Sequence, residues 1–167
     1  MKLRERWYSP RVQSDVTVVR WGHFGRPVIV FPTAGGDAEE IERMRVIDSL
    51  GDLSDAGRIK VYSCDSIAGY AMVRGDGSPR YRAALLFATP LHFLPGLNGG
   101  ILDQLRSRFA ILASGEGRWE DIGHSWKLAG VMGEKGIPNR VDPWGTDYDH
   151  DWPTWRRMLP HYLNELS

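Results

Sequence analysis

The chain has 167 residues, which is the size of one domain. Its 21 Lys and Arg residues balance 21 Asp and Glu residues, so the net charge of zero provides neither a basic field for nucleic acid nor a polybasic patch for a membrane. The apolar share of 42%, with 25% charged residues, indicates a folded globular chain and excludes a disordered one.

The cysteine content and the apolar runs restrict the cellular setting. Cys64 is the only cysteine, which excludes an intramolecular disulfide and a zinc site built on a Cys pair. Residues 1–6 are charged and no apolar core follows them, so they do not resemble a signal peptide. No stretch approaches the about 18 consecutive apolar residues of a membrane span. We therefore expect a cytoplasmic protein.

The first half of the chain alternates strand and helix patterns. Strands are predicted over 15–20, 27–31 and 59–63. The segment 27–31 is apolar throughout, which is typical of a strand buried on both faces of a parallel sheet. Asp37 with Glu40 three residues later resembles a capping box and predicts the start of a helix. Apolar residues follow it at helical spacing: Ile41, Met44, Ile47 and Leu50.

The second half continues the alternation. Helices are predicted over 98–105, 122–132 and 155–166, the last of which has the clearest amphipathic pattern. Strands are predicted over 109–113 and, more weakly, over 140–144. Strands that alternate with helices predict an α/β fold in which helices cover both faces of a parallel sheet.

The loop over 31–37 follows the first apolar strand. Two glycines let its backbone N–H groups approach a ligand closely, and the helix that follows favours negative charge at its N-terminus. Such a loop suits an oxyanion hole or a phosphate-binding cradle. A tight strand-to-helix turn is the alternative. The loop is not a phosphate-binding P-loop, because no Gly-Lys-Ser/Thr follows.

Carboxylates gather in the loop over 115–121, which follows the next apolar strand. Glu120 and Asp121 lie near the predicted start of a helix, where carboxylates are stabilised by the helix dipole. The alternative is a chemical role, in which one of them orients a catalytic histidine.

A histidine lies among aspartates in the loop over 144–153. His150 follows the last predicted strand, which is the position of the base in a Ser–acid–His triad. A solvated surface histidine is the alternative. A divalent-metal site at His150 and its neighbours Asp147, Asp149 and Asp151 is a third, although the pattern lacks the Gly and distal Glu of a calcium loop.

The three loops occur in the chain order of an α/β-hydrolase, and several segments resemble one branch of that superfamily. From about Val18 to its C-terminus, the chain is similar to the esterase D-like branch of the α/β-hydrolases. The segments that carry the resemblance are PVIVFPTAGGD (27–37), VYSCDSIAG (61–69), TPLHFLPGL (89–97), LASGEGRWED (112–121) and WGTDYDHDWPTWRRMLPHYL (144–163).

The resemblance implies a fold and a reaction class. The fold is a three-layer αβα sandwich with a mostly parallel sheet, here a single domain over 1–167. The reaction is hydrolysis of a small-molecule ester or thioester by a Ser–acid–His triad, without a metal ion or an organic cofactor. The resemblance places His150 at the base, Glu120 or Asp121 at the acid, and an oxyanion loop at Thr33, Ala34 and Gly35.

The chain departs from this family at the nucleophile. The family serine lies on a G-x-S-x-G turn between the segments that correspond to 61–69 and 89–97, and this sequence contains no G-x-S-x-G. Compared with the family, about 60 residues, or two strand–helix units, are absent from the central part of the sheet, with the junction near 86–87. Without a nucleophile there is no acyl-enzyme, so we expect activity to be impaired or absent.

Two residues are candidates to replace the missing serine as the nucleophile. Ser66 and Cys64 follow the strand over 59–63, close to the expected position of the site. Neither is flanked by the glycines that the strained nucleophile turn requires, and a capping role for Ser66 is the alternative.

Two further expectations follow from the absent segment. A chain that keeps the pocket without the nucleophile could act as a non-catalytic ligand- or protein-binding module, and the tryptophans between Trp119 and Trp155, five of the seven, could line it. Loss of central strands also exposes apolar sheet edges, which have to pair differently or be covered by a partner, and a homo-oligomer is one candidate for that cover.

Overall fold

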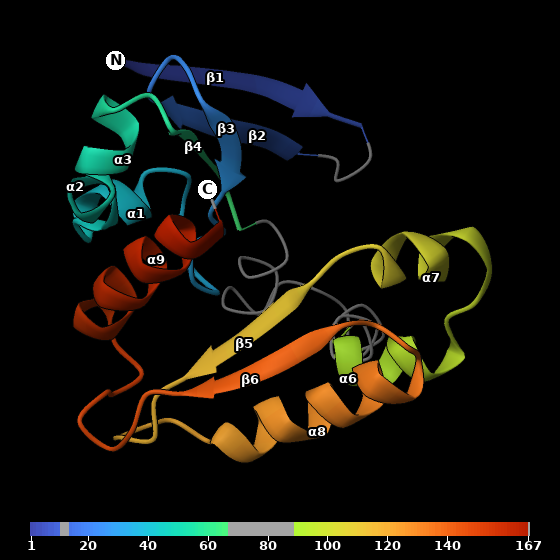
Figure 1. Cartoon of the computed structure of the whole chain (residues 1–167). Helices are drawn as coiled ribbons and strands as arrows, with labels where there is room; N and C mark the ends of the chain where they lie inside the picture. The colour runs from blue at the N-terminus through green and yellow to red at the C-terminus, as the bar shows by residue number, and fades with distance from the viewer. Residues whose placement is uncertain (11–13, 67–88, 167) are drawn as a thin grey trace. The chain divides into compact units, whose positions relative to one another are not determined.

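The computed structural model describes residues 1–10, 14–66 and 89–166 (Figure 1). The chain forms two compact units, one built from residues 1–78 and 155–167 and the other from 79–154. The sequence junction near 86–87 lies outside the described residues.

A four-stranded sheet with the order β1-β2-β4-β3 forms the base of the first unit. Strand β1 (Lys2–Ser9) is antiparallel to β2 (Ser14–Trp21), which is antiparallel to β4 (Ile59–Cys64). Only β3 (Arg26–Ile29) runs parallel to β4. The sheet is mixed, so the predicted mostly parallel arrangement does not describe it. A parallel pair needs a long crossover, which only the segment between β3 and β4 supplies, whereas the short β1–β2 connection makes a hairpin.

The helix predicted after residue 37 is three short helices. They are α1 (Glu40–Arg43), α2 (Val46–Ser49) and α3 (Gly51–Asp55). The break between the first two lies at Arg45, whose φ of 61° is left-handed. A non-glycine residue cannot continue a right-handed helix from that conformation, so the apolar spacing persists while the helix does not.

One face of the sheet and the helices form the core of the first unit. Figure 1 shows α1–α3 and α9 (Trp152–Leu166) on the same side of the sheet, and α9 belongs to this unit from Trp155 onward. Buried residues alternate along β2 and β4, as expected for strands with one covered face. The buried apolar side chains are Val19, Trp21, Ile59 and Val61 from the strands and Ile41, Val46, Leu50, Leu53, Met158 and Tyr162 from the helices.

The second unit is built on a strand–helix–strand motif. Strands β5 (Ala110–Ser114) and β6 (Asn139–Pro143) are parallel and are connected through α8 (Ile122–Glu134). Two further helices, α6 (Pro90–Phe93) and α7 (Gly99–Arg106), flank a 3₁₀ turn over Leu94–Gly96. The buried centre consists of Leu94, Leu102, Met132 and Ile137.

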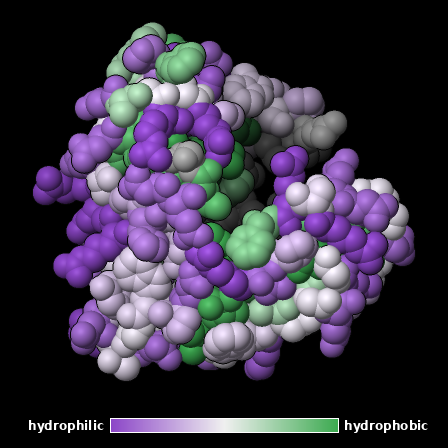
Figure 2. All heavy atoms as spheres, viewed as in Figure 1, coloured by the Kyte–Doolittle hydropathy of each residue, from purple (hydrophilic) through white to green (hydrophobic). Residues whose placement is uncertain are grey.

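The surface is predominantly polar where the helices of the first unit face outward. Figure 2 shows mostly hydrophilic residues on the left, over α1–α3 and α9. Within the described part of the chain, the helices are all too short or too polar to cross a membrane.

Candidate functional site

The loops that follow β5 and β6 meet in the second unit. Because the two strands are parallel neighbours, their carboxyl ends lie at the same edge of the sheet and their loops emerge together. Three backbone hydrogen bonds join the loops: Glu116 N–H to Gly145 O (3.0 Å), Gly117 N–H to Tyr148 O (3.1 Å) and His150 N–H to Arg118 O (3.0 Å).

Glycine is required where the two loops are closest. A Cβ atom on Gly115 would lie 1.9 Å from the Tyr148 carbonyl oxygen. A Cβ atom on Gly117 would lie 2.4 Å from Asp149 Oδ1. These glycines therefore permit a backbone approach that any side chain would block, and the approach brings the acid loop to the histidine.

Glu120 and His150 form a contact across the two loops. His150 Nδ1 lies 3.3 Å from Glu120 Oε1. The Glu120 side chain is 11% exposed, whereas that of His150 is 56% exposed. The hydroxyl of Ser114, a buried residue at the end of β5, donates to the Gly115 carbonyl (2.8 Å) and lies at a longer distance, 3.3 Å, from the other Glu120 oxygen, Oε2. The carboxylate of Glu120 is thus enclosed, while the His150 side chain is more than half exposed.

Asp121, the other predicted acid, has a different environment. Its Oδ1 accepts a 2.9 Å hydrogen bond from the Gly123 N–H and caps α8, and its Oδ2 lies 3.2 Å from His124 Nδ1. The Asp121 side chain is exposed. Of the two carboxylates predicted as alternatives for the acid, Glu120 contacts His150, whereas Asp121 contacts His124.

An ion pair fixes the residue that precedes His150. Asp149 accepts three hydrogen bonds from Arg118: from the backbone N–H (2.7 Å), from Nε (2.9 Å) and from Nη2 (2.8 Å). The backbone hydrogen bond, followed by the guanidinium, lowers the pKa of Asp149 below its ordinary value. Since Arg118 also accepts the His150 N–H through its carbonyl, this pair sets the position of the histidine loop.

The pKa of Asp149 provides a test of this ion pair. Because the pKa is lower in the folded chain, the stabilising interaction is complete above the ordinary value of 3.8 and is lost as the pH falls through the lower, folded value. We expect the ¹⁵N–¹H resonance of the Arg118 amide to titrate with a midpoint below pH 3.8 and to lose this transition in Asp149→Asn. A midpoint at or above 3.8 would show that the pair does not form.

Two of the aspartates near His150 accept hydrogen bonds from neighbouring parts of the chain. Asp149 pairs with Arg118, and Asp151 Oδ1 accepts a 2.6 Å hydrogen bond from the Trp152 N–H at the start of α9. Within residues 1–10, 14–66 and 89–166, no group of three or more His, Cys, Asp or Glu side chains is arranged to hold a metal ion.

The predicted oxyanion loop lies in the first unit and is held by Glu40. The Glu40 carboxylate accepts the Thr33 backbone N–H (2.7 Å) through Oε2 and the Thr33 hydroxyl (2.8 Å) through Oε1. A Cβ on Gly36 would lie 2.2 Å from Glu40 Oε2. The predicted capping box is therefore absent, because Glu40 reaches back to Thr33. The Thr33 N–H is engaged, which leaves those of Ala34 and Gly35, neither of which donates to a described residue.

The two substitute nucleophiles also lie in the first unit, at the end of β4. Burial, reinforced by the charge of Asp65, raises the pKa of the Cys64 thiol, so the thiolate is disfavoured at neutral pH. The Ser66 backbone N–H donates to Gly36 O (3.1 Å), while its hydroxyl makes no hydrogen bond with any described residue. Neither residue has the environment of an activated nucleophile.

Two residues of this site, Ser114 and Arg118, are not among those predicted from the sequence. Ser114 lies behind the acid, and Arg118 holds the aspartate beside the base. The hydroxyl at the end of an apolar strand was a usable sequence signal for Ser114, whereas the position of Arg118 depends on loop geometry that no local pattern specifies. Trp119, which the sequence suggested as a lining residue, has a left-handed φ of 67° and is 88% exposed, both unfavourable for a large aromatic residue.

Comparison with solved structures shows the fold. No family model and no curated protein sequence matches the chain. A ferulic acid esterase superimposes with a TM-score of 0.68 at 9% sequence identity, over 100% of this chain and 99% of the other. An S-formylglutathione hydrolase (FrmB) from Staphylococcus aureus superimposes with a TM-score of 0.61 at 9% identity, over 99% and 95% of the two chains. Both are esterase-type α/β-hydrolases, so the predicted α/β class and resemblance are confirmed at the level of the fold.

Proposed function

We propose that this chain is an esterase-type α/β-hydrolase homologue with a site for carboxylic esters or thioesters, and that its hydrolytic activity is impaired or absent. Both structural neighbours are named for the hydrolysis of such compounds, which supports the substrate class. Each neighbour is matched over nearly its whole length, which supports one α/β-hydrolase-like domain over residues 1–167 with the layered αβα architecture of that fold.

The observation that carries this proposal is the contact between Glu120 and His150. An enclosed carboxylate 3.3 Å from Nδ1 orients the imidazole and sets its tautomer, as the acid does in a Ser–acid–His triad. Nε2 is then the nitrogen that acts as the general base.

Impairment follows from the missing nucleophile. With no G-x-S-x-G in the sequence, the proton that His150 accepts has to come from water. Water would attack the carbonyl carbon while His150 takes a proton from it. The C–O or C–S bond of the ester or thioester would then break, His150 would return the proton to the departing alcohol or thiol, and the carboxylic acid would be released without an acyl-enzyme. The chemistry requires neither a metal nor an organic cofactor.

Pre-steady-state hydrolysis of p-nitrophenyl acetate tests this proposal. An activated ester reports general-base catalysis by an imidazole even where no serine participates. We expect slow, linear release of p-nitrophenolate without an initial burst, and a rate that falls to the buffer rate in His150→Ala. A burst equal to the enzyme concentration, followed by steady turnover, would contradict the proposed impairment.

A ligand-binding module on the same scaffold is the second candidate, favoured by Trp119. A large aromatic side chain that is 88% exposed in a left-handed conformation, next to Glu120, suits a contact surface for a planar ligand. Saturable quenching of tryptophan fluorescence by an aryl ester or its acid, lost in Trp119→Ala and kept in Trp126→Ala, would support this candidate. A linear, non-saturable response would exclude it.

A further inference from the structure

The loop that follows β3 folds into a β-turn at the residues predicted to form the oxyanion loop. Gly36 N–H donates to Thr33 O (2.9 Å), which closes the turn and places Ala34 and Gly35 at its two central positions. Two glycines make such a turn flexible unless other groups hold it. Donors that stabilise a developing charge are effective only when they are already in place, so the contacts of the flanking residues matter.

Glu40 holds the start of the turn. Its carboxylate accepts the Thr33 backbone N–H through Oε2 (2.7 Å) and the Thr33 hydroxyl through Oε1 (2.8 Å). The same carboxylate lies against Gly36, where a Cβ atom would overlap with it. Glu40 therefore contacts both residues that close the turn, and a hydrogen bond to a charged acceptor is stronger than one between neutral groups.

Asp65 holds the other end of the loop. It follows β4, and its Oδ1 accepts the Ala38 N–H (3.0 Å) while its Oδ2 accepts the Thr17 N–H on β2 (2.8 Å). The Asp65 N–H donates to Thr17 O (3.1 Å), and the Ser66 N–H donates to Gly36 O (3.1 Å). Thr17 is buried, so the end of the loop is tied to a buried part of the sheet.

The neighbouring acids have other partners. Asp37 forms an ion pair with Arg43 (2.9 Å), and Glu39 forms one with Lys2 (2.6 Å). Glu39 is the residue before Glu40 and carries the same charge, but its ion pair leads to β1 and not to the turn. Glu39 therefore provides a matched control for the removal of a carboxylate from this segment.

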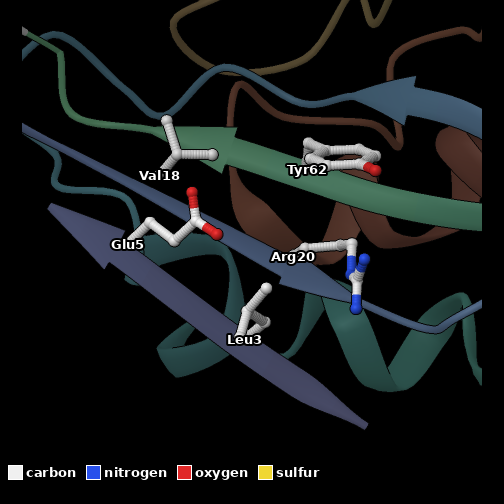
Figure 3. A pocket seen from close by; sticks show the side chains of 5 residues that line it. All are labelled: Leu3, Glu5, Val18, Arg20 and Tyr62. Atoms are coloured by element: carbon white, nitrogen blue, oxygen red, sulfur yellow. The ribbon is translucent and has the colours of Figure 1, made fainter.

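A pocket on the sheet of the first unit carries no comparable information. It lies between β1, β2 and β4 and is lined by Leu3, Glu5, Val18, Arg20 and Tyr62 (Figure 3). Arg20 and Glu5 bring opposite charges to the pocket, so its lining does not define the charge of a ligand. The contacts of the loop, in contrast, identify which side chains hold a chemically defined part of the proposed site.

We propose that Glu40 and Asp65 are positioning residues, which together hold the oxyanion loop in one conformation before a substrate binds. The inference rests on the proposed function, because the loop acts only on the negative charge that develops on an ester or thioester carbonyl. Each carboxylate acts through the backbone of the loop and not on the substrate. Loss of either one should weaken stabilisation of the transition state and leave binding of the ground state unchanged.

Amide hydrogen exchange followed by NMR tests the hold on the loop without requiring activity. Glu40→Ala removes the acceptor of the Thr33 N–H, so the protection of that amide should fall at least about tenfold. Glu40→Gln should retain the protection, because its amide oxygen accepts the Thr33 N–H and its NH₂ group donates to the Thr33 hydroxyl. Glu39→Ala should leave the Thr33 amide unchanged.

Asp65→Ala should expose the Ala38 amide to exchange in the same way. It removes the acceptor of the Ala38 N–H and also that of the Thr17 N–H. Circular dichroism shows whether each variant is folded. If Asp65→Ala does not fold, the comparison of Glu40→Ala with Glu40→Gln decides the outcome.

Hydrolysis of p-nitrophenyl acetate tests the positioning role. Glu40→Ala should lower the kcat of the His150-dependent reaction at least about tenfold at an unchanged KM, whereas Glu40→Gln and Glu39→Ala should react as the wild type does. A kcat that persists in Glu40→Ala although the Thr33 amide has lost its protection would overturn the proposal. So would protection of Thr33 that survives Glu40→Ala, or a kcat that falls equally in Glu40→Gln.

Failure of the proposed function would look different. A wild-type chain without His150-dependent hydrolysis would overturn that function and, with it, the catalytic role of the loop. The exchange measurement would still show whether Glu40 and Asp65 hold the loop.

Discussion

Glu120→Gln is expected to lower the His150-dependent hydrolysis of p-nitrophenyl acetate at least about tenfold. The substitution keeps the size of the side chain and the hydrogen-bonding position beside Ser114, but it removes the charge 3.3 Å from His150 Nδ1. An imidazole that gains a proton in the transition state loses its counter-charge and its preferred tautomer. The rate is measured above the buffer background, with His150→Ala as the zero.

Asp121→Asn is the matched control for that substitution. Asp121 is the next residue and is also a carboxylate, but it caps α8 and does not contact His150. Its removal should leave the ester rate unchanged while costing at most about 1 kcal/mol of stability, because Asn is also a good N-cap. A rate that falls in Asp121→Asn and persists in Glu120→Gln would reverse the assignment of the acid.

Gly25→Ala is expected to destabilise the first unit by about 3 to 5 kcal/mol. Gly25 has a φ of 97°, which an L-residue adopts only with strain, and a Cβ atom there would lie 2.5 Å from the Arg58 carbonyl carbon and from the Ile59 nitrogen. Both are backbone atoms at the start of β4, so the clash can be relieved only by separating β3 from β4. Urea unfolding followed by circular dichroism measures the loss.

Gly57→Ala is the control that measures the cost of the left-handed backbone conformation without the steric clash expected at Gly25. Gly57 also has a positive φ, of 68°, but a Cβ atom there would meet only Phe24 Cδ1, at 3.4 Å. Its substitution should cost about 1 to 2 kcal/mol, the cost of the left-handed conformation alone. Equal losses in the two variants would show that β3 does not pack against β4 as described.

The order of strands and helices was largely predictable from local patterns, and their pairing was not. The apolar run of β5 and the amphipathic spacing of α9 each involve residues close in sequence, so the hydrophobic pattern predicted both elements. Strand β1 was missed because its charged residues conceal its alternation. The mixed sheet was also missed, since strand direction depends on the length of the connections and on partners distant in sequence.

The candidate site shows the same division. His150 and Glu120 were named from their loops, because charged residues after parallel strands are expected at one edge of the sheet. The sequence could not distinguish Glu120 from Asp121, because the side chains of adjacent residues at a helix start point in different directions and only the structure shows which one contacts His150. Glu40 likewise has the spacing of a capping box, yet it binds Thr33, seven residues earlier, because Gly36 leaves room for its carboxylate.

Covalent labelling of the wild-type chain with a fluorophosphonate, measured by intact-mass spectrometry, tests the central claim most directly. A serine activated by a general base forms a stoichiometric phosphonyl adduct, and a serine without one does not. We predict no mass increase under conditions that label a serine esterase to completion, because Ser66 lacks an activated environment and the sequence contains no G-x-S-x-G motif. A stoichiometric adduct on one serine, formed together with loss of ester turnover, would contradict this account.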